Sequence, residues 1–360
     1  MDWSRNNSVR EGVWICVAAA ALAILVLGAP PALARDLPMG KPAREGLSAP
    51  RLERITEHMN QAVADGVMVG GLGLIARNGR VVYEETYGLA DREAGTPMRE
   101  DTIFRIYSMS KPITSVAVMM LYEQGHFFLN DPVARYLPEL ADLEVAVSTA
   151  DGGDTRITSD GTSSRTEGEG DTNRAGETRE PRRQPTIRDL LTHTAGFTYG
   201  VFGNTEVDKL YREAQLMSDD LTLETFVERL GGIPLQYEPG TRWHYSVSVD
   251  VLGRLVEVVS GMPFGEYLEK HLFAPLGMVD TGFRVPDDQW SRVAQLYTPK
   301  GTRPGPGAFL NPSTSTELEV ADESVSAGYR SGRAVRKRRR WAGFHRRRLS
   351  ALQPDAAQRR

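Results

Sequence analysis

The chain has 360 residues, enough for one large domain or two small ones, and 40% of them are hydrophobic, which is sufficient to form a core. Its formal net charge of −4 argues against a protein that binds polyanions through its overall composition. The only cysteine is Cys16, so a mature chain that lacks the N-terminal segment has no disulfide, no thiol nucleophile and no thiolate metal site.

The N-terminal segment is typical of a secretion signal. Basic residues precede an apolar run over 13–27, and Pro30 follows it. A small-x-small cleavage sequence stands at 32–34, so we expect residues 1–34 to be a signal peptide that is removed on export, which gives a secreted or periplasmic protein. The alternative is an uncleaved membrane anchor formed by 13–27, although that run is short for a bilayer span.

The next part of the chain predicts a helix and a β-hairpin. Residues 35–51 form a Pro-rich, polar linker, and apolar side chains at helical spacing predict a helix over 52–65. Two strand-like runs follow, 69–77 and 80–87. The dipeptide Asn-Gly at 78–79 joins them and favours a type I′ hairpin turn.

A Ser-x-x-Lys sequence opens the helix predicted over 108–124. Positions i and i+3 lie on the same helix face, so the ammonium of Lys111 can reach the hydroxyl of Ser108 and favour its ionised, nucleophilic form. A strand-like stretch at 104–107 leads into the serine, and Pro112 fits the first turn, where its missing N–H has no partner to lose. The alternative is an N-capping serine beside a solvated lysine.

The remaining chain predicts one long insertion and several short helices. Residues 148–184 contain almost no apolar side chains, so we expect a disordered, exposed insertion. Apolar periodicity resumes over 187–193, and further helices are predicted over 223–230, 247–260 and 264–272. No His, Cys, Asp or Glu pattern has metal-ligand spacing and no cofactor motif is present, so we expect neither a metal nor a cofactor. A Gly-x-Ser-x-Gly elbow, which an α/β-hydrolase would need, is also absent from the sequence.

Four segments together resemble a known family. They are FRIYSMSKPITSVAVMMLYEQG at 104–125, RDLLTHTAGF at 188–197, PGTRWHYS at 239–246 and PLGMVDTGF at 275–283. In order and spacing they resemble the class C β-lactamase superfamily, which includes esterases and penicillin-binding-protein-like hydrolases. The resemblance covers a domain over about 52–330. It implies an α+β fold of the β-lactamase/transpeptidase type, with an antiparallel sheet, flanking helices and an all-helical domain.

The resemblance also implies a reaction and its residues. Ser108 would form an acyl-enzyme with a small-molecule ester or amide, with Lys111 and Tyr245 as its partners and its own backbone N–H as an oxyanion donor. This describes a carboxylesterase or a β-lactamase-related hydrolase. Read without the family, Tyr245 is better explained as an ordinary half-buried core tyrosine ahead of a helix.

Other residues receive roles from the same comparison of motifs. The resemblance places Tyr107, Tyr199, His244 and Val247 along the substrate cleft. It makes His193 and Gly196 parts of a structural turn. Lactamases usually continue Tyr-x-Asn after the catalytic tyrosine, whereas this chain has Val247, which favours an esterase-like member.

The C-terminal tail differs in charge from the body. Residues 331–360 carry eleven Lys or Arg and a single Asp, a net of +10, whereas the rest of the chain carries −14. One interpretation is a basic arm that binds nucleic acid or anionic lipid. Runs of Arg are also typical of GC-rich codons read in a shifted frame, and no Lys-Ser/Thr-Gly strand, the family's source of a second oxyanion donor, follows Tyr245.

We therefore expect a frameshift, real or from sequencing, between about 322 and 331, with the last family strands missing and the basic tail outside the family. Nucleic acid is then not expected as a partner, nor is a membrane after signal cleavage. The alternative function is that of a catalytically impaired product, or of a binding protein that retains the cleft. The sequence leaves the oligomeric state open.

Overall fold

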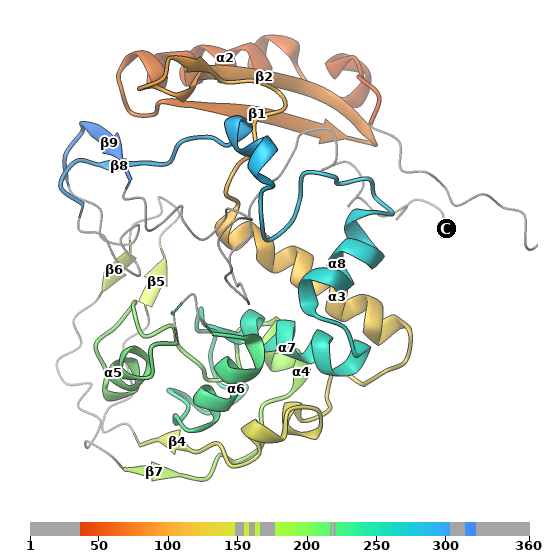
Figure 1. The fold of residues 1–360 in the computed structure, drawn as a ribbon, viewed down its shortest axis with the longest axis vertical. Helices are drawn as coiled ribbons and strands as arrows, with labels where there is room; N and C mark the ends of the chain where they lie inside the picture. The colour runs from red at the N-terminus through yellow and green to blue at the C-terminus, as the bar shows by residue number, and fades with distance from the viewer. Residues whose placement is uncertain are drawn as a thin grey trace, which may run out of the picture.

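The computed structural model describes residues 37–147, 155–157, 163–165, 177–216, 218, 221–302 and 314–321. These residues form the predicted α+β fold, with an antiparallel hairpin at one end and a helical region at the other (Figure 1). The predicted signal peptide at 1–34 and the basic tail at 331–360 lie outside the described residues. No helix in the described part of the chain is long and apolar enough to cross a bilayer.

The hairpin consists of strands β1, Gly70–Arg77, and β2, Arg80–Asp91, which pair antiparallel. The turn residues Asn78 and Gly79 have φ values of 51° and 71°, as a type I′ turn requires, so the predicted turn is confirmed. Strand β3, Thr96–Pro97, extends the sheet in the order β1-β2-β3. Among the described residues no strand pairs with the outer edge of β1.

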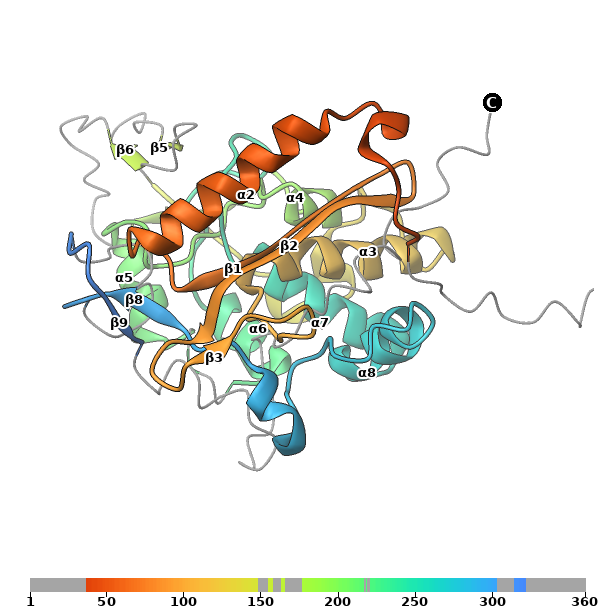
Figure 2. The same ribbon diagram turned by 90° about the horizontal axis from the view of Figure 1, so that it is seen from above.

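Helix α2, Ala49–Ala64, covers one face of this hairpin. Leu52 packs with Tyr83 and Tyr87 of β2 in a small apolar cluster, and the hydroxyls of Thr56 and Tyr83 lie 3.0 Å apart. Figures 1 and 2 show α2 on one side of β1 and β2, with α3 on the other side. Helix α3 therefore lies on the side of the hairpin opposite α2.

The helical region is built around α7, Ser248–Ser260. It packs against α3 (Ser110–Glu123), α4 (Ile187–Leu191), α6 (Leu223–Gly231) and α8 (Phe264–Leu268). Side chains from these helices form the main core, and Ala117 and Val118 of α3 are completely buried in it. The packing of α3 against α7 therefore fixes the positions of the segments that lead into the two helices, residues 107–109 and 244–247.

Short elements complete the described chain. The 3-10 turns are Pro42–Glu45, Tyr107–Met109, Val133–Arg135, Pro138–Leu140 and Asp287–Arg292, and a π-helical turn, Glu269–Phe273, follows α8. Helix α5 is Glu206–Glu213. The remaining strands pair as β4 (Val145–Ala146) with β7 (Thr178–Arg179), β5 (Thr155–Ile157) with β6 (Ser163–Arg165), and β8 (Tyr297–Pro299) with β9 (Leu318–Val320).

The C-terminal end of the insertion predicted over 148–184 is ordered, in contrast to the expectation of disorder. Residues 177–184 are attached to the domain, because β7 pairs with β4 and Arg183 donates two hydrogen bonds to Asp189, at 2.5 and 2.9 Å. Burial alone would raise the pKa of Asp189, but the bonds from Arg183 and from the backbone of Thr186 outweigh it and lower that pKa. Most of the other insertion residues lie outside the described ranges.

The strand-like conformation predicted for residues 104–107 is not found. Ile103 makes a single bridge to Val293, and residues 104–106 have irregular backbone. Tyr107 then takes a φ of 41°, in the left-handed region, which ends any extended run before the serine.

Candidate active site

Ser108 lies in the middle of the 3-10 turn Tyr107–Met109, at the N-terminus of α3. The N–H of Met109 donates to the carbonyl of Ile106 at 2.9 Å, and the hydroxyl of Ser110 donates to the carbonyl of Tyr107 at 2.5 Å. These bonds hold the turn while the side chain of Ser108 remains exposed. Among the described residues no acceptor pairs with the backbone N–H of Ser108, which suits a donor to an oxyanion.

Three side chains named from the sequence meet at this turn. The hydroxyl oxygen of Ser108 lies 2.6 Å from the phenolic oxygen of Tyr245, and the ammonium of Lys111 donates to the same serine oxygen at 3.2 Å. The Lys111 nitrogen also lies 4.7 Å from the centre of the Tyr245 ring. A cation in this position stabilises negative charge on either oxygen, and the two oxygens are close enough to exchange a proton directly.

The segment that carries Tyr245 is fixed by hydrogen bonds to the 193–198 turn. The N–H of His244 donates to the carbonyl of His193 at 2.8 Å, and the N–H of Ser246 donates to the ring Nδ1 of His193 at 3.3 Å. The N–H of Val247 donates to the carbonyl of Thr198 at 3.3 Å. Two of the sequence segments that resembled one family therefore support each other directly.

His193 occupies a position behind Tyr245, with the two ring centres 5.0 Å apart. Burial, then the positive charge of Lys111, then His244, lower the pKa of His193 to about 4. Its ring is therefore neutral near pH 7, and its Nδ1 acts as the acceptor for the N–H of Ser246. This geometry positions the Tyr245 segment and leaves proton transfer at Ser108 to Tyr245 and Lys111.

Gly196 closes the same turn in a conformation that needs glycine. Its φ is 90°, and a Cβ there would lie 2.1 Å from the carbonyl oxygen of Tyr237. The carbonyl of Gly196 also accepts from the N–H of Gln236 at 2.8 Å.

Aromatic side chains surround Tyr245. Its ring centre lies 5.4 Å from that of Tyr199, 5.8 Å from that of Phe202 and 6.2 Å from that of Trp243. The sequence analysis named Tyr199 but missed Phe202 and Trp243. Trp243 stands two residues before Tyr245, a spacing that puts both on one side of an extended segment and could have identified it. Phe202 has no such local signal, because the fold of the 198–204 loop places it.

Two of the expected cleft residues occupy other positions. Val247 is completely buried in the main core, so its side chain does not line the cleft. The Nε2 of His244 lies 3.3 Å from the hydroxyl of Thr198, which donates to the buried Asp208 at 2.8 Å. Burial lowers the pKa of His244, with Asp208 opposing this shift and Arg242 adding to it. Extended backbone turns neighbouring side chains to opposite faces, which explains why His244 faces inward where Tyr245 faces Ser108.

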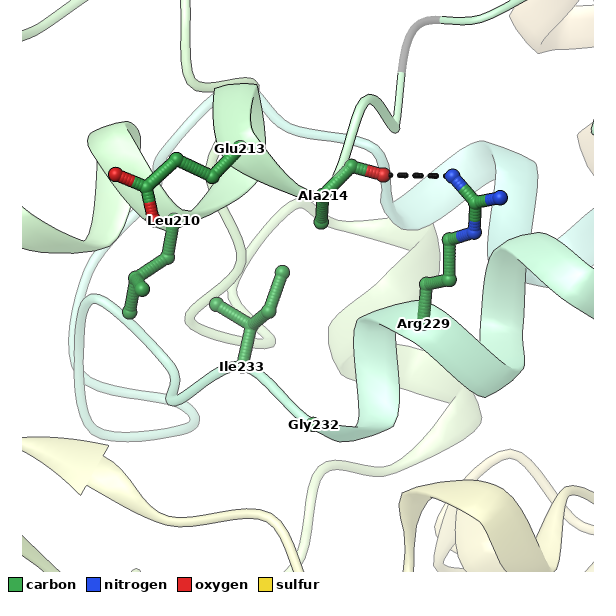
Figure 3. Close-up of a pocket in the computed structure, with 6 residues that line it drawn as sticks. All are labelled: Leu210, Glu213, Ala214, Arg229, Gly232 and Ile233. Atoms are coloured by element: carbon green, nitrogen blue, oxygen red, sulfur yellow. Dashed lines mark hydrogen bonds between the residues drawn. The ribbon is translucent and has the colours of Figure 1, made fainter.

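Figure 3 shows a pocket whose lining includes none of the trio Ser108, Lys111 and Tyr245. It has a volume of about 410 Å³ and is lined by Leu210, Glu213, Ala214, Arg229, Gly232 and Ile233. Arg229 closes one side by donating to the carbonyl of Ala214 at 2.9 Å. None of the reactive side chains lines it, and the described residues contain no group of three or more potential metal ligands.

Comparisons with known proteins agree on one family. The β-lactamase family model matches residues 55–357, a range that extends into the tail that the sequence analysis set outside the family. Esterase EstB of Burkholderia gladioli is 35% identical over 232 residues, which cover 64% of this chain and 51% of the esterase. Monacolin J acid methylbutanoyltransferase of Aspergillus terreus is 30% identical over 205 residues, or 56% of this chain and 43% of that enzyme.

Solved structures give the same fold. EstCE1, described as a hydrolase with promiscuous acyltransferase activity, superposes with a TM-score of 0.58 at 29% identity and covers 83% of this chain and 71% of its own. Simvastatin synthase from Aspergillus terreus superposes with a TM-score of 0.62 at 24% identity, covering 85% of this chain and 68% of its own. The chain spans about half the length of the curated relatives it matches.

Proposed function

Because the chain belongs to the β-lactamase family, we propose that it is a serine hydrolase that cleaves a small ester or amide through an acyl-enzyme on Ser108. One observation carries the proposal: the oxygen of Ser108 lies within 2.6 Å of the phenol of Tyr245 and 3.2 Å of the ammonium of Lys111. A serine with only a structural role needs neither partner.

In the acylation step Ser108 attacks the substrate carbonyl carbon and its proton passes to the phenolate of Tyr245. Lys111 stabilises the negative charge on both oxygens during this transfer, and the N–H of Ser108 is placed to bind the carbonyl oxygen as it becomes negative. When the tetrahedral intermediate collapses, the carbon–oxygen or carbon–nitrogen bond to the leaving group breaks and Tyr245 returns the proton to that group.

Deacylation uses the same groups in the reverse direction. Tyr245 takes a proton from water, the hydroxide attacks the acyl carbon, and the bond to the Ser108 oxygen breaks. The proton then returns to Ser108, so the enzyme ends in its starting state. One phenol beside one serine can therefore act as base and acid in turn.

The ester rather than the β-lactam is the preferred substrate in this proposal. The similarity to EstB and EstCE1 supports it. Acyl transfer to an alcohol in place of water is a second candidate activity, favoured by the similarity to a methylbutanoyltransferase and to EstCE1.

A fluorophosphonate probe tests the central claim. We expect the full chain to be labelled on Ser108 and Ser108→Ala to lose all labelling, because the phosphonate forms its covalent bond with an activated serine oxygen. Ser260→Ala, at the far end of α7, is the matched control and should label like the wild type. Equal labelling of the wild type and Ser108→Ala, or none of either while both remain folded, would contradict the proposal.

An impaired product of the same family is the other candidate. It is favoured by the outer edge of β1, which no strand of the described residues covers. This candidate predicts that the probe labels Ser108 slowly while p-nitrophenyl acetate and nitrocefin show no turnover. Steady-state hydrolysis of the ester at a rate well above that of Ser108→Ala would exclude it.

Export through residues 1–34 is also a proposal, supported by the sequence features of that segment. N-terminal sequencing of the protein from an expressing Gram-negative host tests it. A mature end at residue 35 is expected, and a cytoplasmic protein that retains Met1 would contradict it.

A further inference from the structure

Two large aromatic side chains beside the reactive trio are largely exposed. Trp243 is 52% exposed and Phe202 is 43% exposed. Both contact the ring of Tyr245, Trp243 in a stacked arrangement at 25° between planes and Phe202 edge-on at 69°. Burying rings of this size is strongly favourable, so exposed rings grouped at a nucleophile form a surface suited to an apolar ligand.

The position of these rings relative to Tyr245 indicates which part of an ester they contact. In the proposed mechanism the phenol of Tyr245 gives its proton to the departing oxygen, so the alcohol portion must lie on the Tyr245 side of Ser108. Trp243 and Phe202 are the two largely exposed rings that contact Tyr245, whereas His193, which lies 5.0 Å from the Tyr245 ring centre and 6.2 Å from that of Trp243, is only partly exposed. The alcohol thus leaves across the two exposed rings.

We propose that Trp243 and Phe202 form a leaving-group subsite that selects esters of apolar alcohols of about aromatic size, such as benzyl esters. This inference rests on the proposed function. In the step concerned, the bond between the acyl carbon and the alcohol oxygen breaks, the acyl carbon remains bonded to Ser108, and the proton that Ser108 lost reaches the alcohol through Tyr245. An alcohol held on Trp243 stays beside the proton donor while that bond breaks.

Two ester series test the subsite. One keeps the acetyl group and enlarges the alcohol from methyl through butyl to benzyl, alcohols of similar intrinsic leaving ability; the other keeps methanol and lengthens the acyl chain. We expect kcat/KM of the wild type to rise along the alcohol series. Trp243→Ala should lower kcat/KM for the benzyl ester about 10-fold and change the methyl ester little, because only the larger alcohol reaches the ring.

Three further variants separate contact from support. Trp243→Phe keeps a flat ring and should retain most of the benzyl preference, and Phe202→Leu should reduce it less than Trp243→Ala does. Phe128→Ala is the matched control, because Phe128 is 73% exposed and lies in the loop beyond the C-terminal end of α3, whereas Ser108 lies at its N-terminus. It should leave both series unchanged.

The outcomes distinguish this inference from the proposed function. An equal loss for methyl and benzyl esters in Trp243→Ala would mean that Trp243 only positions Tyr245, and it would overturn the subsite. A wild type that is labelled at Ser108 and hydrolyses esters without regard to the alcohol would overturn the subsite alone. A folded wild type with neither labelling nor ester hydrolysis would overturn the proposed function and the subsite with it.

Discussion

The phenolic oxygen of Tyr245 and the hydroxyl oxygen of Ser108 lie 2.6 Å apart although 137 positions separate them in the sequence. Neither residue is inside a regular helix: Ser108 lies just before α3 and Tyr245 just before α7. These two helices pack against each other in the main core. The N-termini of two packed helices thus bring Ser108 and Tyr245 together.

Removing only the phenolic oxygen of Tyr245 tests its role in proton transfer. Tyr245→Phe keeps the ring among Trp243, Tyr199 and Phe202, so we expect an unchanged melting temperature. Because no base then takes the serine proton, kcat/KM for an ester should fall about 100- to 10,000-fold. Steady-state kinetics and thermal melting measure both quantities, and an activity within a few-fold of the wild type would assign the base to another group.

The lowered pKa of His193 predicts how stability depends on pH. The unfolded chain binds a proton at His193 near its ordinary pKa of about 6.5, whereas the folded protein does so only near a pKa of about 4. Between these values the unfolded state binds more protons, so the free energy of unfolding falls as the pH falls, by up to about 1.4 kcal/mol per unit. Urea denaturation at pH 7, 6 and 5 measures this slope.

His193→Gln should flatten that slope, since the side chain no longer titrates. His126→Gln, at an exposed histidine, is the matched control and should keep the slope of the wild type. If His193→Gln and the wild type show the same dependence on pH, the charge of His193 is not linked to folding.

Gly196 and Gly66 form a matched pair for the turn behind Tyr245. Both have positive φ values, 90° and 72°, but a Cβ on Gly66 would meet no atom within 4 Å, whereas one on Gly196 would lie 2.1 Å from the carbonyl oxygen of Tyr237. We expect Gly66→Ala to cost about 1 kcal/mol of unfolding free energy from backbone strain alone. Gly196→Ala should cost about 3 kcal/mol, and equal unfolding midpoints for the two variants would contradict this.

The buried position of Val247 predicts that restoring the lactamase-like amide fails. Val247→Asn places a polar amide in the main core, which should cost about 2 kcal/mol or more of unfolding free energy. Because the side chain does not face the cleft, nitrocefin hydrolysis should not increase. A stable variant with measurable nitrocefin turnover would show that residue 247 reaches the substrate after all.

The hairpin and the reactive trio show what local sequence determines. Asn78-Gly79 identifies its turn because few residues tolerate positive φ. The three-residue spacing of Ser108 and Lys111 places both side chains on the same face of one helical turn. The position of Tyr245 was available only through the resemblance of its whole segment to a family, because no local rule connects it with Ser108.

Tertiary contacts decided the parts that the sequence did not predict. Composition suggested disorder at Arg183, but its two hydrogen bonds to Asp189 hold the segment in place. The four residues before Ser108 have strand-like composition, yet Tyr107 adopts a left-handed backbone. Phe202 reaches Tyr245 only because the loop before α5 folds over it. Each of these conformations depends on contacts with residues that are distant in the sequence or on the fold of a whole loop, which local sequence patterns do not reveal.

The left-handed backbone of Tyr107 lowers the stability of the fold at a position next to the reactive serine. A φ of 41° on a bulky residue costs about 1 to 3 kcal/mol, which glycine at the same position would recover. Selection for heat resistance alone should therefore favour replacement of Tyr107, whereas selection for catalysis should retain it if its ring or its turn shapes the approach to Ser108. Populations evolved under these two pressures should diverge at this position first. The residue found at position 107 would then show whether a lineage was selected for thermal stability or for catalysis.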